Sequence, residues 1–306
     1  MSAGELPPID ESALIDAVPK TATVNLAIGS SCFVRCEGCY NHFGDTYSEG
    51  GLLSAAEIVD FVSDAKNEGV EQATVSGGDP LSHPEIVDIL SGVKGEGLTV
   101  KLDTVGTALL EDGRIIFKGR GIVPRIGVSA IAPFVDYVNL PLDGASQETV
   151  GHFRRGRSNL FAETRAVGQL LRGAGVAFGY NTVANTANID ELNKIKKIAE
   201  EDGASEWQVF EFDPNGPNPT NQKPKLKLEP GQFEEATRDL SSDTHLDVVC
   251  KSLASRNGLY FLVDDSGQAW KPAGEGLRTI MGHVVRDRSI VLESLRAHIK
   301  SLGANI

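Results

Sequence analysis

The chain has 306 residues, of which 41% are hydrophobic, with a net charge of −13 at pH 7 and a sequence pI near 5.0. This is enough apolar sequence for a large core, and the acidic balance argues against nucleic acid or an anionic membrane as a partner. No apolar run approaches the length that spans a bilayer, and the amino terminus lacks the basic and apolar blocks of a secretion signal. We therefore expect a cytoplasmic protein with no nucleic-acid partner and no membrane partner.

Short apolar strands alternate with helices along most of the chain. Residues 1–20 are rich in proline and acidic residues and are expected to form an N-terminal arm. A capping box of Ser54 and Glu57 predicts the start of the first helix. Strands are expected at 23–29, 72–76, 98–103, 136–142, 176–183 and 207–212, with helices at 54–62, 84–93, 162–172 and 190–200. This order predicts an α/β fold, a partial (β/α)6 parallel barrel over residues 21–214, because six strands are too few for the usual closed barrel of eight.

Residues 215–306 are predicted to form a small C-terminal α+β extension, a layer separate from the barrel. Its expected parts are a turn-rich connector at 215–221, a helix at 230–240, a hairpin at 259–270 and a helix at 292–299.

Three of the four cysteines, Cys32, Cys36 and Cys39, fall in eight positions at a C-x3-C-x2-C spacing directly after the first predicted strand. A short loop with this spacing can turn three thiolates towards one centre, and thiolates suit iron–sulfur clusters, zinc or copper(I). Cys250 is far away in the sequence, so the loop is expected to supply three ligands and to leave one iron of a cubane open. The alternatives are a zinc knuckle completed by Cys250 or a histidine, and reduced structural thiols.

This spacing resembles the signature of the radical S-adenosylmethionine (radical SAM) superfamily. The resemblance implies that Cys32, Cys36 and Cys39 hold a [4Fe-4S] cluster whose open iron binds SAM, and that cleavage of SAM yields a 5′-deoxyadenosyl radical. It also implies an electron donor such as flavodoxin or ferredoxin. The family usually has an aromatic residue just before the third cysteine, whereas this chain has Gly38 there and Tyr40 just after, so Tyr40 is the candidate for contact with the adenine.

The second motif is Gly77-Gly78-Asp79 at the end of the second strand. Adjacent glycines let the backbone approach a ligand closely, although an ordinary strand-to-helix turn has the same residues. The motif is similar to the family's Gly-Gly-Glu-Pro loop, which implies that Gly77, Gly78 and Asp79 bind the amino group of SAM. Thr104, in a turn resembling the family's Thr-Asn-Gly, is a candidate for contact with the ribose, and Asn181, at a strand end, is a candidate for contact with the ribose or the substrate.

The third motif, residues 138–144 followed by three nearby arginines, resembles the "Ser-Leu-Asp-Gly, then Arg-Gly" pattern of the branch that modifies peptides and small metabolites. Pro141 replaces the usual serine. Arg154 or Arg155, with Arg155 preferred, is the candidate for pairing with the SAM carboxylate, because guanidinium groups match carboxylates. The group of Arg154, Arg155 and Arg157 also suggests an anionic substrate, and the alternative is a solvated basic turn.

Charged residues that interrupt apolar strands must be paired or face a polar interior. Lys101, Asp103 and Glu211 are such residues. We expect Glu211 to point into the barrel, whereas Lys101 fits a pair or the barrel interior equally, and Glu211 or Lys101 is expected to handle protons. Cys250 is predicted to be a core residue. The extension resembles the SPASM or twitch domain of related enzymes, but lacks their additional cysteines, so we expect a lid over the barrel mouth that holds no cluster.

Together these features predict a radical SAM enzyme that abstracts hydrogen from a small polar, anionic sugar or nucleoside. The most specific expectation is decarboxylation of cytosylglucuronate in nucleoside antibiotic biosynthesis, by resemblance to the radical SAM decarboxylases of those pathways. The alternatives are modification of a precursor peptide, radical dehydration, epimerisation or oxidation of a sugar, and a non-catalytic metal-binding module.

Overall fold

The computed structural model describes residues 21–39, 52–215, 223–256, 258–274 and 277–303. The predicted arm at 1–20 and the predicted adenine contact Tyr40 lie outside the described residues. Within the described part, no helix is long and apolar enough to cross a membrane.

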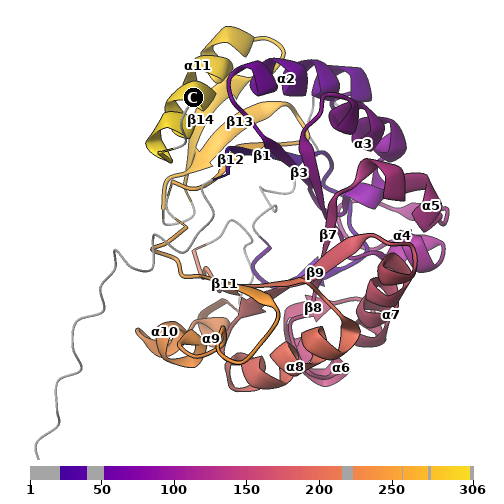
Figure 1. Ribbon diagram of the computed structural model, residues 1–306, viewed down its shortest axis with the longest axis vertical. Coiled ribbons are helices and arrows are strands. Elements are labelled where there is room, and N and C mark those ends of the chain that lie inside the picture. The colour runs from indigo at the N-terminus through magenta and orange to yellow at the C-terminus, as the bar shows by residue number, and fades with distance from the viewer. Residues whose placement is uncertain (1–20, 40–51, 216–222, 257, 275–276, 304–306) are drawn as a thin grey trace, which may run out of the picture.

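A curved, mostly parallel sheet forms the centre of the molecule, and helices cover its outer side (Figure 1). All six predicted strands are present, they pair in parallel, and they follow the order β1-β3-β4-β7-β9-β10 across the sheet. Among the described residues the sheet ends at β11 and β14 rather than closing, which confirms the α/β partial barrel. The bounds of these six strands are β1 (Thr23–Ala27), β3 (Gln72–Ser76), β4 (Thr99–Asp103), β7 (Tyr137–Pro141), β9 (Ala177–Ala184) and β10 (Glu206–Glu211).

The helices that follow these strands begin where the sequence provides a cap or a turn. Ser54 and Glu57 form the predicted capping box, with the Ser54 side chain accepting from the Glu57 N–H and the Glu57 carboxylate accepting from the Ser54 N–H. The helices are α2 (Ala55–Asn67), α3 (Ile86–Gly95), α4 (Thr107–Leu110), α5 (Val128–Ile131), α6 (Gln147–Phe153), α7 (Leu160–Gly173), α8 (Leu192–Asp202), α9 (Lys223–Leu226), α10 (Gln232–Thr237) and α11 (Arg288–Ser301).

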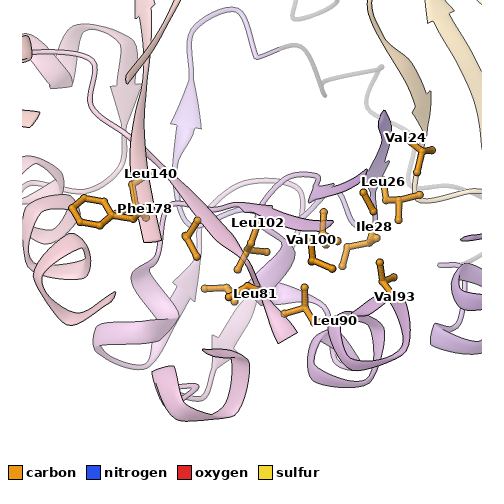
Figure 2. Close-up of a cluster of buried hydrophobic side chains, with 14 of the residues drawn as sticks. Val24, Leu26, Ile28, Leu81, Leu90, Val93, Val100, Leu102, Leu140 and Phe178 are labelled. Atoms are coloured by element: carbon orange, nitrogen blue, oxygen red, sulfur yellow. The ribbon is translucent and has the colours of Figure 1, made fainter. Parts of the chain in front are cut away.

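The two faces of the sheet differ in chemistry because side chains alternate along a strand. The outer face is apolar: Val100 and Leu102 of β4 and Leu140 of β7 pack towards Leu90 and Val93 of α3 (Figure 2). This core has no polar interruption along those strands, whereas the residues between them, such as Lys101 and Asp103, fall on the inner face. Apolar packing against the helices therefore stabilises the sheet on its outer face, and polar side chains can occupy its inner face.

The C-terminal residues form the predicted α+β extension, but the expectation of a separate layer is wrong. β11 (Asp247–Lys251) pairs in parallel with β10, and β12 (Phe261–Val263) pairs in parallel with β1, so the extension lengthens the sheet at both edges. The predicted hairpin is β12 with β13 (Gln268–Pro272), and β14 (Arg278–His283) adds a further antiparallel strand. Exposed edges of an open sheet offer unpaired backbone groups, and these strands satisfy them.

Two short antiparallel pairs lie outside the main sheet. One is formed by β2 (Arg35–Cys36) and β8 (Arg154–Arg155), and the other is the hairpin of β5 (Gly113–Ile115) and β6 (Gly121–Val123). Neither was predicted, and both bear on the cysteine loop.

Candidate active site

The cysteine loop begins where β1 ends and is fixed by backbone contacts on two sides. The Cys32 N–H donates to the Phe117 carbonyl over 3.0 Å, and the Cys32 carbonyl accepts from the Ile116 N–H at the same distance. These bonds tie the loop to the hairpin of β5 and β6. On the other side, β2 within the loop pairs with β8, and the Glu37 N–H donates to the Phe153 carbonyl over 2.8 Å. The loop is therefore held in a defined shape by its neighbours.

The three thiols of the loop lie close enough to influence one another. Cys32 is buried, and Cys36 and Cys39 are half-buried. Burial is the main cause that raises the pKa of the Cys32 thiol, and negative charge on Asp79, Cys36 and Cys39 adds to it. Burial likewise raises the pKa of Cys36 to about 12, against the opposing charge of Arg154. Such thiols become thiolates when they bind metal, because the cation replaces the proton.

The chemistry of this loop fits a cluster better than a single ion. A structural zinc site needs four ligands around one centre, whereas the thiolates of an iron–sulfur cluster each bind a different iron. Cys250 lies on the outer face of β11, where it packs against the core, as predicted, and burial raises its pKa to about 11. The zinc alternative therefore lacks its fourth ligand from Cys250.

The Gly77-Gly78 turn approaches the start of the cysteine loop so closely that only glycine fits. The Gly78 N–H donates to the Gly29 carbonyl over 2.6 Å. A Cβ atom at Gly77 would overlap the Gly29 carbonyl oxygen, and one at Gly78 would overlap the carbonyl oxygens of Ser30 and Ser31. Gly77 also has φ of +144°, a conformation that other residues rarely adopt. The two loops thus form one surface, which fits backbone recognition of a zwitterion next to the cysteines.

Asp79 and Thr104 bind each other. The buried Asp79 carboxylate accepts from the Leu81 N–H (3.0 Å), the Val105 N–H (2.8 Å) and the Thr104 hydroxyl (2.9 Å). Burial raises the pKa of Asp79 to about 6, despite these bonds. This hydrogen bond between Asp79 and Thr104 joins the loops after β3 and β4. The polar groups of both side chains are therefore already engaged, and their predicted contacts with SAM stay predictions.

The three arginines of the third motif all have carboxylate partners. Arg154 pairs with the buried Asp143, Arg155 pairs with Glu37 over 2.9 Å, and Arg157 pairs with Glu163 over 2.5 Å and with Glu111. The suggestion that this group attracts an anionic substrate therefore loses its basis. The contact of Arg155 with the SAM carboxylate stays a prediction.

Arg154 contacts the cysteine loop directly, which the sequence did not predict. Its Nη1 donates to the Cys36 sulfur over 3.2 Å, while its Nε donates to Asp143. Cys36 and Arg154 are register partners in the β2–β8 pair, so two residues far apart in the sequence are placed opposite each other. A pairing of two-residue strands leaves no periodic signal in the sequence, and this is why it was missed.

The inner face of the sheet has a network of polar side chains from β4, β7, β10 and β11. Lys101 lies 3.7 Å from Glu206, whose other oxygen accepts from Gln208. The Lys251 ammonium donates to the Gln208 amide oxygen over 2.5 Å. Burial lowers the pKa of Lys251 to about 8, although Glu206 and Asp103 act in the opposite direction. Lys101 thus lies in the polar interior, where it is also paired.

Two buried amide oxygens on this face have no hydrogen-bond donor in the described part of the chain. Asn139 is 4% exposed, its Nδ2 donates to Asp103 over 2.7 Å, and its Oδ1 is unpartnered. The Oδ1 of Asn181, a predicted ribose or substrate contact on the neighbouring strand, is also buried and unpartnered. A buried acceptor without a donor is costly, so these two atoms fit a ligand with hydroxyl or N–H groups.

The inward orientation predicted for Glu211 is wrong. β10 pairs with β9 without a bulge, and Glu211 has the same parity as Trp207 and Val209, which pack in the outer core. Its carboxylate accepts from the Leu253 N–H over 2.7 Å. Glu211 is therefore not a partner of Lys101, and the inward carboxylate of β10 is Glu206.

Phe212 lies beside the residue that precedes the third cysteine. Gly38 has φ of +81°, and a Cβ atom there would come within 2.5 Å of the Phe212 ring. Phe212 is buried and meets Phe153 edge to face, with ring centroids 6.1 Å apart. An aromatic ring from the end of β10 thus packs against Gly38, a position at which the cysteine loop itself has no side chain.

Comparison with known proteins agrees with this site. The model of the Radical SAM superfamily matches residues 26–201, more than half of the chain. Over 187 residues the chain is 29% identical to an AdoMet-dependent heme synthase of Methanosarcina barkeri, covering 61% of this chain and 49% of that protein. The chain thus spans about half the length of this curated relative.

Solved structures of low sequence identity have the same fold. Streptococcus suis SuiB bound to its precursor peptide SuiA superposes with a TM-score of 0.68 at 11% identity, covering 92% of this chain and 67% of that chain. Native anSMEcpe with bound AdoMet superposes with a TM-score of 0.64 at 14% identity, covering 93% of this chain and 84% of that chain.

Proposed function

Because the chain belongs to the radical SAM superfamily, whose members hold a [4Fe-4S] cluster and SAM, we propose that it abstracts hydrogen from a small polar substrate with an anionic group. Cys32, Cys36 and Cys39 are the proposed cluster ligands, and the backbone of Gly77 and Gly78 is proposed to bind SAM beside them. When bound, cluster and SAM supply the electron and the 5′-deoxyadenosyl radical for this chemistry. The protein's own part is to bind, orient and shield the reacting groups.

The observation that carries the proposed substrate class is the polar inner face of the sheet. Lys101 and Lys251 provide positive charge there, and Arg256 joins Lys251 over the Phe210 ring, with distances of 6.0 Å and 4.9 Å to its centroid. No carboxylate lies within ion-pair distance of Lys251 in the described residues. An anionic group of the substrate is proposed to bind Lys251, and its hydroxyl or N–H groups are proposed to donate to the orphan oxygens of Asn139 and Asn181.

A carboxylated sugar nucleoside has this combination of groups. Our most specific proposal is therefore the decarboxylation of cytosylglucuronate, with Lys101 as the candidate proton carrier, because it lies beside Glu206 and is partly exposed to the interior. A flavodoxin or ferredoxin is the proposed source of the electron.

The first experiment compares wild type with Cys36→Ala and Cys250→Ala after anaerobic reconstitution. We expect about four iron and four sulfide per chain in wild type, and release of 5′-deoxyadenosine from SAM with dithionite. Cys250→Ala is the matched control, because it removes a thiol on the outer face, and it should behave as wild type. Cys36→Ala should lose the release. Zinc in place of iron, or an iron protein that ignores SAM, would contradict the proposed function.

The second experiment tests the substrate class on the reconstituted enzyme. Cytosylglucuronate should stimulate 5′-deoxyadenosine release, its neutral 6-alcohol should stimulate it much less, and Lys251→Met should remove the difference between the two. Equal responses to acid and alcohol would contradict the anionic class. A response only to a precursor peptide would favour the peptide-modifying alternative.

A further inference from the structure

The Arg154 side chain is fixed by contacts with a buried carboxylate and an aromatic ring. Its Nε donates to Asp143, whose side chain has no exposed surface, and Asp143 also accepts from the Val183 N–H over 2.7 Å. Its guanidinium lies 5.5 Å from the centre of the Phe153 ring. Asp143 follows β7, Phe153 belongs to α6 and Val183 lies in β9. Three parts of the fold therefore set the position of the guanidinium.

The free edge of this fixed guanidinium faces a proposed cluster ligand. Nη1 lies 3.2 Å from the Cys36 sulfur, whereas Asp143 contacts Nε on the other side of the fork. The positive group is therefore nearer to the sulfur than the negative group that balances it. An ion pair between Arg154 and Asp143 that served only the structure would not require a second contact with sulfur. The pairing of β2 with β8 places Arg154 opposite Cys36 and so produces that contact.

We propose that Arg154 is a positioning residue for the cluster, which orients the Cys36 thiolate and raises the reduction potential of the cluster that this thiolate helps to hold. This rests on the proposed function, because it assumes that Cys36 is a ligand. Reduction adds one negative charge to a cluster, so a cation that donates a hydrogen bond to a ligand sulfur stabilises the reduced state more than the oxidised state. Hydrogen bonds to the sulfurs and nearby charge are general determinants of such potentials. The consequence here is easier acceptance of the electron that SAM cleavage requires.

The test is an EPR-monitored redox titration of the reconstituted protein without SAM. Arg154→Gln should shift the midpoint potential to more negative values, because the donor is lost and Asp143 is left unbalanced. Arg154→Gln with Asp143→Asn should shift it less in the same direction, since the negative charge is removed as well and the Val183 N–H keeps an acceptor. Arg154→Lys keeps the charge and should fall between the double variant and wild type. It also provides a readout if the glutamine variants do not fold.

Arg155→Gln is the matched control, because Arg155 is the next residue on the same strand but pairs with Glu37 and is half-exposed. Its potential should shift much less than that of Arg154→Gln, because Arg155 is half-exposed and solvent screens its charge. The inference would be overturned if the Arg154 variants had the same midpoint potential as wild type. It would also be overturned if Arg155→Gln shifted the potential as much as Arg154→Gln does. A wild type that assembles no reducible cluster would contradict the proposed function instead.

Discussion

At the residue scale, the close contact of the Gly77-Gly78 turn with the cysteine loop makes a clear prediction. Gly78→Ala should lower the free energy of unfolding by about 1–3 kcal/mol, because the new methyl group meets the carbonyl oxygens of Ser30 and Ser31, which cannot move independently of the loop. Urea unfolding of the metal-free protein measures this. Gly29→Ala is the control on the opposite side of the contact, since its Cβ would meet no heavy atom within 4 Å. Equal costs in the two variants would contradict the close approach.

Lys251 leads to a prediction about pH. Its folded-state pKa of about 8 lies below the ordinary value of 10.5, so the unfolded chain binds more protons between these pH values. The stability of wild type should therefore rise with pH through this window. Lys251→Met should raise the free energy of unfolding at pH 7 by roughly 1–3 kcal/mol, from about 1.4 kcal/mol per pKa unit reduced by partial solvation. The gain should disappear above about pH 10.5.

The measurement for Lys251 is the difference in unfolding free energy between wild type and variant from pH 7 to 11. Lys197→Met, on the exposed face of α8 with only a 4.0 Å contact to Glu201, is the control and should give a flat difference. A difference for Lys251→Met that does not depend on pH would show that the ammonium is well solvated.

The site residues that could be predicted are those that belong to a sequence motif with a defined spacing. The three cysteines and the two glycines follow from local motifs, and the structure places both motifs side by side. The prediction for Glu211 failed because interruption of an apolar strand does not say which face a charge is on. Alternation would have helped: Trp207 and Val209 are apolar and share parity with Glu211, which indicates the outer face.

At the scale of elements, the six strands of the barrel were predictable because each is a short, mainly apolar segment between turn residues. In the C-terminal extension, β12 was predicted only as part of a hairpin and not as part of the barrel sheet, and β11 was not predicted. Their partners, β10 and β1, are set by which edges remain open after the barrel has formed, and this is a property of the whole fold. The pairs β2–β8 and β5–β6 are too short to leave a pattern.

Packing of α2 against α3 provides a test at this scale. Gly92 of α3 lies so close to Val59 of α2 that a Cβ atom would overlap a Val59 methyl group. Gly92→Ala should lower the free energy of unfolding by about 1–3 kcal/mol, although alanine is the better helix former. In a Val59→Ala background the same change should be neutral or stabilising by up to about 1 kcal/mol. The four unfolding free energies form a double-mutant cycle, and equal effects in both backgrounds would show that the helices are further apart.

At the scale of the whole molecule, the distribution of charge is uneven. The chain has a net charge of −13, yet residues 113–125 contain four basic residues and no acidic residue. This hairpin binds the cysteine loop through Cys32 and Phe117. Beside it, the exposed Arg35 and Arg155 are register partners on β2 and β8, an arrangement of like charges that does not favour pairing. We call Arg35, Arg114, Lys118 and Arg120, which lie on the hairpin and on the cysteine loop that it contacts, the basic surface.

The basic surface adjoins the proposed cluster ligands, which fits the docking of an acidic electron-carrier protein such as flavodoxin. Opposite charges speed such encounters by about tenfold to a thousandfold at low ionic strength, and salt screens them. The rate of 5′-deoxyadenosine release with limiting reduced flavodoxin should therefore fall steeply as KCl increases. Arg114→Glu with Arg120→Glu should lower the rate about tenfold or more at low salt and flatten the salt dependence.

Two comparisons separate docking from other causes. With photoreduced deazaflavin, a small donor that needs no protein interface, wild type and the double variant should release 5′-deoxyadenosine at the same rate. Arg286→Glu with Lys300→Glu makes the same change in net charge at exposed positions before and within α11, so it should keep the steep salt dependence of wild type. If both pairs of substitutions slow the flavodoxin reaction equally, the overall charge of the protein governs the encounter and the basic surface has no special role. If only the hairpin pair does, electrons enter this acidic protein through the basic surface beside its cysteine loop.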